Sequence, residues 1–182
     1  MCGGKGSTRR VASPPHQGAF ENEVPSWSRD GKWVYFSSDR TGSLEIWKVP
    51  AAGGPAVQVT RHGGSNAFES ADERFLYYWN HEAFWRMPLE GGEETRVIEG
   101  IGEFDGWRVL AGGICLVNTR ATPAELRFLD FATNHVRLVS KLDLGISAPG
   151  SGAFTVSPDG KWVVYGRVDA LDSDIMLLEN FH

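Results

Sequence analysis

Short apolar runs separated by tight-turn residues recur along the whole chain. Residues 25–36 hold an apolar stretch, the turn sequence Ser-Arg-Asp-Gly-Lys and a bulky apolar run, and residues 154–165 repeat this order with Ser-Pro-Asp-Gly-Lys. Serine and aspartate accept hydrogen bonds from turn amides, and glycine takes the left-handed conformation, so each copy predicts two strands joined by a hairpin. Weaker copies lie at 68–78 and 107–117.

The four copies are spaced like one repeating unit. With Trp33, Phe75, Ile114 and Trp162 taken as equivalent, the spacings are 42, 39 and 48 residues. A period of about 40 residues with four strands per unit is WD40-like and typical of a propeller blade. The second strand of each unit is apolar on both faces, as expected of a strand packed between two neighbouring blades.

Two further strand-like runs follow each copy. The third runs are 44–49, 83–87, 125–129 and 174–178, and the fourth are 56–60, 94–98 and 136–140. The pattern therefore predicts an all-β fold, a β-propeller of about four four-stranded antiparallel blades. We expect one domain over 1–182, with blades at about 20–60, 61–98, 99–140 and 141–182.

The last copy has no fourth run after 174–178, whereas residues 8–12 resemble an isolated fourth strand. Residues 8–12 are a candidate closing strand for the last blade, because a ring closed in this way leaves no free sheet edge. Two alternatives stay open. The chain is a fragment of a larger six- to eight-bladed ring, or two copies form a homodimer that completes a ring.

Composition narrows the function classes. The formal net charge is −5 and no basic run offsets it, so nucleic acid is not expected as a direct partner. No apolar stretch approaches the roughly 20 residues that span a bilayer, and the first residues lack the apolar core of a signal peptide, which predicts a cytoplasmic protein without membrane contact. A periplasmic location is the alternative if the chain belongs to a longer parent that carries a signal peptide. Of the two cysteines, Cys2 and Cys115, the second is expected to be a buried core residue.

The loops that join each fourth strand to the next first strand are the candidate binding region, because they should line one mouth of the ring. They span 13–23, 61–67, 99–105 and 141–152. Ordinary solvated loops are the alternative interpretation. The polar residues that could hold a peptide or a cation are His16, Glu21, Glu23, His62, Asn66, Glu103 and Asp105.

We expect neither catalysis nor a bound cofactor or metal. The chain has no Gly-x-Ser-x-Gly nucleophile motif, and its histidines fall in different blades without a nucleophile beside them. Asp169, Asp172 and Asp174 form a cluster that could suggest calcium, but the surrounding sequence lacks the glycine and the distal glutamate of a helix-loop-helix site. Turn capping is the favoured interpretation of these aspartates.

With the Asp-Gly-Lys turns and the Ser-Ser-Asp-Arg-Thr-Gly stretch at 37–42 in view, residues 20–182 resemble the TolB-type β-propeller family. Residues 172–181 also resemble the C-terminal propellers of bacterial winged-helix transcriptional regulators and kinases. The resemblance implies a non-catalytic protein-interaction or ligand-sensing module in a regulatory or signalling setting, with a protein or peptide partner. The alternative is the propeller portion of a hydrolase, such as a prolyl-oligopeptidase-type peptidase, without its catalytic domain.

Overall fold

The computed structural model describes residues 21–102, 104–145, 154–157, 159–169 and 172–179, and within these ranges all regular structure is β-strand. None of the described residues forms a helix that could cross a membrane. The strands are β1 (Asn22–Trp27), β2 (Trp33–Ser38), β3 (Glu45–Pro50), β4 (Val57–Gln58), β5 (Ser65–Glu69), β6 (Phe75–Trp79), β7 (Ala83–Pro88), β8 (Thr95–Glu99), β9 (Gly106–Leu110), β10 (Gly113–Asn118), β11 (Ala124–Asp130), β12 (His135–Leu142), β13 (Phe154–Val156), β14 (Trp162–Asp169) and β15 (Asp172–Glu179).

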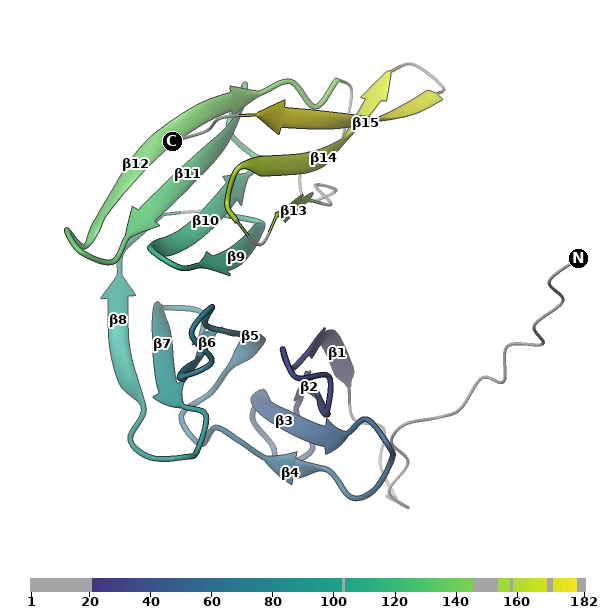
Figure 1. Ribbon diagram of the computed structural model, residues 1–182, viewed down its shortest axis with the longest axis vertical. Coiled ribbons are helices and arrows are strands. Elements are labelled where there is room, and N and C mark those ends of the chain that lie inside the picture. Colours follow the sequence, from purple (N-terminus) through teal and green to yellow (C-terminus); the bar gives the residue numbers. More distant parts are fainter. Residues whose placement is uncertain (1–20, 103, 146–153, 158, 170–171, 180–182) are drawn as a thin grey trace, which may run out of the picture.

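The strands form four antiparallel sheets that follow the chain order. β1 to β4, β5 to β8 and β9 to β12 each make a four-stranded blade, and β13 to β15 make a blade with three described strands. Figure 1 shows the four sheets arranged around a common centre. The inner strands contact one another in sequence, β1 with β5, β5 with β9 and β9 with β13. The predicted four-bladed β-propeller is therefore confirmed.

The predicted hairpin chemistry is also confirmed. In the first blade the Ser28 hydroxyl accepts a hydrogen bond from the Trp33 amide at 2.8 Å and donates to the Asp30 carboxylate at 2.7 Å. The Asp30 carboxylate accepts from the Lys32 amide at 2.9 Å, and Gly31 has a φ of 69°. The hydrogen bonds from Lys32 and Ser28 lower the pKa of Asp30 to about 2. The last blade repeats the same bonds in its own turn.

The second blade places an ordinary residue where this turn favours glycine. Glu73 occupies the position of Gly31 with a φ of 56°, a conformation that costs an L-residue about 1–2 kcal/mol. We expect Glu73→Gly to raise the free energy of unfolding by about 0.5–1 kcal/mol, because relief of this strain exceeds the entropy that glycine adds to the unfolded chain. Urea denaturation measures the change. Glu73→Ala is the control, and equal stability of the two variants would contradict the strain argument.

One equivalence in the predicted repeat is wrong by one residue. The second strand of the third blade begins at Gly113 and not at Ile114. The spacing from Phe75 is therefore one residue shorter than predicted, and the spacing to Trp162 is one residue longer. A Cβ at Gly113 would lie 1.9 Å from the Leu129 carbonyl oxygen, so only glycine fits there. The sequence alignment matched apolar side chains, and Gly113 has no side chain to match with those of the other blades.

Three clusters of apolar side chains fill the spaces between successive blades. Every residue of β10 is buried, as predicted for a strand between two blades. Cys115 lies in this strand as a core residue, and burial raises the pKa of its thiol to about 12. In the last blade Val163 and Tyr165 belong to the cluster shared with the third blade, whereas Trp162 and Val164, on the alternate face of β14, lie outside that cluster and are only partly buried. The predicted sandwiching therefore holds in part for this strand.

The outer strands deviate most from prediction. β4 is reduced to Val57–Gln58, because the amides of Val59 and Thr60 both turn toward the carbonyl oxygen of Ile46. In contrast, β12 extends to Leu142, beyond the predicted end of the third blade. The predicted closing strand at 8–12 lies outside the described residues, so its role stays a prediction.

Candidate functional site

A cavity of about 340 Å³ lies at the centre of the propeller, where segments far apart in the sequence meet. It is lined from all four inner strands or the residues next to them, so its shape depends on the packing of the blades. Ligand sites in proteins have volumes from about 300 Å³ upward. The residues that give it chemical character are Val24, Asn66, Phe68, Asp105, Arg108 and Phe154.

Arg108 supplies the positive charge of this cavity. Its guanidinium carbon lies 4.8 Å from the centre of the Phe68 ring and 5.4 Å from that of Phe154, so aromatic rings of the second and fourth blades contact it. Its Nη1 donates to the Trp107 carbonyl oxygen at 2.7 Å. No carboxylate among the described residues forms an ion pair with it, and burial lowers the pKa of Arg108. The side chain remains cationic, because the pKa of arginine starts far above neutrality.

Asp105 brings a carboxylate to the same cavity, but its oxygens are engaged elsewhere. One oxygen accepts from the Thr119 amide at 2.7 Å and from the Thr119 hydroxyl at 2.6 Å. The other lies 3.2 Å from the Nε of Arg120, and the side chain is only 8% exposed. Asp105 therefore fixes the turn after β10 and is paired with a cation of its own.

The inner strands of the first two blades, β1 and β5, are strained where they line the cavity. Val24 and Asn66 have φ values of 51° and 52°, and each lies where the pairing of its strand shifts register. A left-handed conformation is a rare and costly state for a β-branched residue such as valine. Such bulges re-aim side chains and are over-represented beside functional sites. Here they contribute Val24 and Asn66 to the cavity lining.

The structure separates the residues predicted to line a mouth of the ring. Asn66 and Asp105 lie together at the central cavity, although Asn66 belongs to β5 and not to a loop. Glu21 and Glu23 are exposed, and Glu23 likewise lies in a strand, β1. His62 pairs instead with Glu94, 3.4 Å away. His16 and Glu103 lie outside the described residues.

Sequence reasoning missed Arg108, Phe68 and Phe154 as site residues. The residues predicted to bind a ligand belong to loops, whereas these three lie in the first strands of their blades. A charged residue between Trp107 and Val109, which are both buried, was the available signal. A cation inside an apolar run of an inner strand has to point to a cavity, a partner or solvent.

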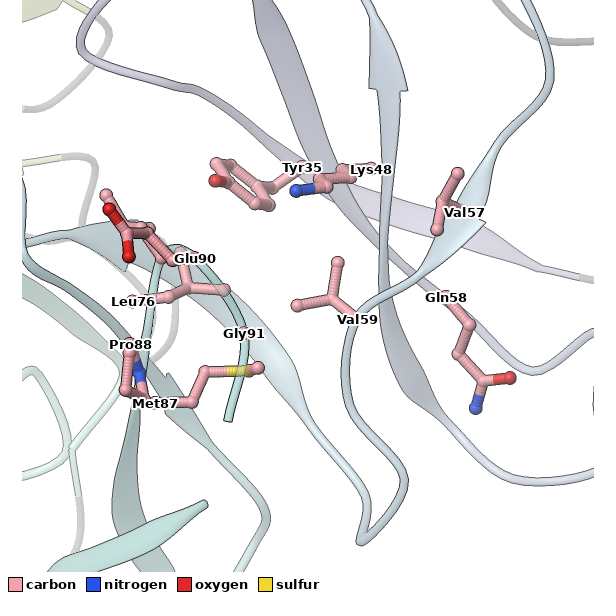
Figure 2. Close-up of a pocket in the computed structure, with 11 residues that line it drawn as sticks. Tyr35, Lys48, Val57, Gln58, Val59, Leu76, Met87, Pro88, Glu90 and Gly91 are labelled. Carbon is pink, nitrogen blue, oxygen red and sulfur yellow. The ribbon is translucent and has the colours of Figure 1, made fainter. Parts of the chain in front are cut away.

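A second cavity, of about 170 Å³, lies between the first two blades (Figure 2). Val57, Val59, Leu76 and Met87 form its apolar lining, with Lys48 and Glu90 at its sides. The hydroxyl of Tyr35, which also lines it, already donates to the Glu69 carboxylate at 2.8 Å. Burial and this bond raise the pKa of Tyr35. This cavity has about half the volume of the central one.

Within the described residues no group of three His, Cys, Asp or Glu side chains could hold a metal ion. Asp169, one member of the aspartate cluster seen in the sequence, pairs with Arg167 through a 3.1 Å contact. Asp169 ends β14 and pairs in the sheet with Asp172, the first residue of β15. The side chains of Asp172 and Asp174 lie outside the described set, so turn capping by them stays a prediction.

Comparisons with known proteins agree with this architecture. No family model matches the chain. Over 43 residues, 24% of the chain, it is 42% identical to an uncharacterized protein of Agrobacterium fabrum, and the match covers 15% of that relative. Among solved structures it is similar to TolB from Acinetobacter baumannii, with a TM-score of 0.65, 19% identity and coverage of 86% of this chain and 40% of that one.

Two further structures show the same likeness. A protein provisionally assigned as TolB from Agrobacterium tumefaciens has a TM-score of 0.67 at 20% identity, with 86% of this chain and 60% of that chain covered. An oligogalacturonate lyase from Vibrio parahaemolyticus has a TM-score of 0.56 at 19% identity, with 85% and 54% covered. The chain is thus a β-propeller, and its propeller is TolB-like. It spans between 40% and 60% of the length of these three structures.

Proposed function

We propose that the chain is a non-catalytic binding module whose ligand occupies the central cavity. The carrying observation is the Arg108 guanidinium, which lines this cavity between two aromatic rings without a carboxylate partner among the described residues. A partly buried cation without a counter-ion is costly unless something else compensates for its lost hydration. A bound ligand would supply that compensation.

The proposed partner is a protein or peptide, and the proposed setting is regulatory or signalling and cytoplasmic. The net charge of −5 argues against direct binding of nucleic acid or of an anionic membrane surface. A second copy of the chain that completes a ring is the alternative partner. Ile175 and Leu177 on β15, which are 80% and 58% exposed, support an additional contact at the edge of the last blade.

A catalytic role is the competing hypothesis, because an oligogalacturonate lyase is among the similar structures. The central cavity offers little support for it. Asp105 is its one described acidic residue, and both of its oxygens are already engaged by Thr119 and Arg120. A general base has to reach its substrate with a free acceptor.

Binding and turnover can be tested on the same isotope-labelled protein. We expect a set of short peptides at millimolar concentration to shift the NMR signals of Asn66, Gly106 and Arg108 saturably, while signals of the outer positions Val57 and Leu138 stay in place. Oligogalacturonate incubated with the protein and manganese should remain uncleaved. Shifts confined to the outer strands would overturn the proposed site, and cleavage above a buffer control would overturn the non-catalytic role.

A further inference from the structure

The position of Arg108 restricts which of its groups a ligand can reach. Phe68 and Phe154 contact the guanidinium through their rings, and the Trp107 carbonyl oxygen accepts one Nη1 hydrogen. The donors left over are N–H groups at the edge of the planar guanidinium. These donors form a fork whose spacing matches the two oxygens of a carboxylate.

The charged residues around the cavity leave a net positive charge, which also favours an anionic ligand group. Asp105 is matched by Arg120, so this pair contributes no net charge. The lining residues on the other strands, among them Val24, Asn66 and Phe154, are neutral. Arg108 thus leaves about one positive charge facing the cavity. A ligand group with a single negative charge balances it, whereas a doubly charged phosphate exceeds it.

Asn66 adds a second donor on β5, the inner strand next to that of Arg108. Its backbone amide donates to the Ser37 hydroxyl at 3.3 Å, but its side-chain amide has no hydrogen-bond partner among the described residues. The left-handed backbone at Asn66 is a conformation that asparagine adopts more readily than most residues. The carboxamide is therefore held on the cavity wall and free to donate or accept.

We propose that the central cavity recognises a carboxylate, with Arg108 as the principal contact and Asn66 as an auxiliary donor. The inference rests on the proposed binding function and specifies the chemistry of its ligand. The apolar surfaces of Val24, Phe68 and Phe154 accommodate the body of the ligand beside the charged group. The C-terminus of a peptide and the carboxylate of a uronic acid both present this chemistry.

Calorimetric titration of the full chain tests the inference. The probes are the tripeptide Gly-Ala-Leu with a free C-terminus, the same peptide amidated, galacturonate and galactose. We expect the free-acid peptide to bind at least tenfold more tightly than its amide. Arg108→Gln should weaken binding of the free acid at least tenfold, because glutamine keeps a planar group without the charge. Arg108→Lys keeps the charge without the fork, so its affinity for the free-acid peptide should lie between that of the parent and that of Arg108→Gln.

Arg137→Gln is the matched control, since Arg137 also lies over a phenyl ring of the third blade, that of Phe128 at 5.4 Å, but on an outer strand. It should bind like the parent. Asn66→Gly keeps the left-handed backbone and should weaken binding a few-fold. The urea midpoint of each variant checks that it is folded.

The outcomes separate this inference from the proposed function. Equal binding of the free-acid and amidated peptides would overturn the carboxylate site and leave the binding function standing. Loss of binding in Arg137→Gln as large as in Arg108→Gln would overturn the assignment to Arg108. Absence of binding for every probe would overturn both. Selective binding of galacturonate over galactose without peptide binding would support the carboxylate site and identify a sugar acid as its source.

Discussion

Replacing Trp107 with alanine should lower the free energy of unfolding by about 3–5 kcal/mol, the range measured for removal of large buried aromatic side chains. Trp107 is 1% exposed, and its ring centre lies 4.8 Å from that of Phe68 and 4.7 Å from that of Phe84. These edge-to-face contacts join the second and third blades. The cavity left by alanine would loosen this interface, and a shifted midpoint in urea or guanidinium denaturation measures the loss.

Two further variants make the Trp107 prediction specific. Trp27→Ala removes the same side chain from an inner strand where it is 65% exposed, and it should change stability by no more than about 0.5 kcal/mol. The indole nitrogen of Trp107 is buried without a hydrogen-bond partner among the described residues, so Trp107→Phe should cost much less than alanine. Equal effects of the alanine substitutions at Trp107 and Trp27 would contradict the blade packing described above.

The features predicted correctly from sequence are those in which a side chain acts on its own local backbone. Ser28 and Asp30 form their turn with residues no more than five positions away, so the pattern that encodes the turn is visible in one short stretch. The same bonds recur around Ser157 and Asp159. Three such turns, in the first, second and last blades, together with a fourth apolar copy at 107–117, suffice to predict a propeller.

The candidate site depends on contacts that no local pattern encodes. Arg108 meets one ring that lies 40 residues before it and another that lies 46 residues after it in the chain, and only the packing of three blades brings them together. Asn66 was predicted to be available to a ligand, but for the wrong reason, because a strand irregularity and not a loop exposes it. Asp105 was predicted as a binding residue, yet its oxygens serve the turn after β10.

The connection from the first blade to the second depends on one buried acid, Glu45. This side chain is 3% exposed, and its carboxyl oxygens accept from the Thr60 hydroxyl at 2.7 Å and from the Gly63 amide at 3.2 Å. The Thr60 oxygen in turn accepts from the Ile46 amide at 2.9 Å. Glu45 therefore satisfies, directly or through Thr60, the polar groups of a segment that leads from β4 to the inner strand β5.

Glu45→Ala should lower the free energy of unfolding by about 3 kcal/mol, because a buried hydroxyl and a backbone amide lose their acceptor and each costs about 1–3 kcal/mol when unsatisfied. Glu45→Gln retains one oxygen acceptor and should lose roughly half as much. Glu21→Ala, at an exposed acid, should stay within about 0.5 kcal/mol of the parent. Denaturation measures all three, and amide hydrogen exchange should show Gly63 and Ile46 opening first in Glu45→Ala. A loss below about 1 kcal/mol would mean that water replaces the carboxyl group and that the connection does not depend on Glu45.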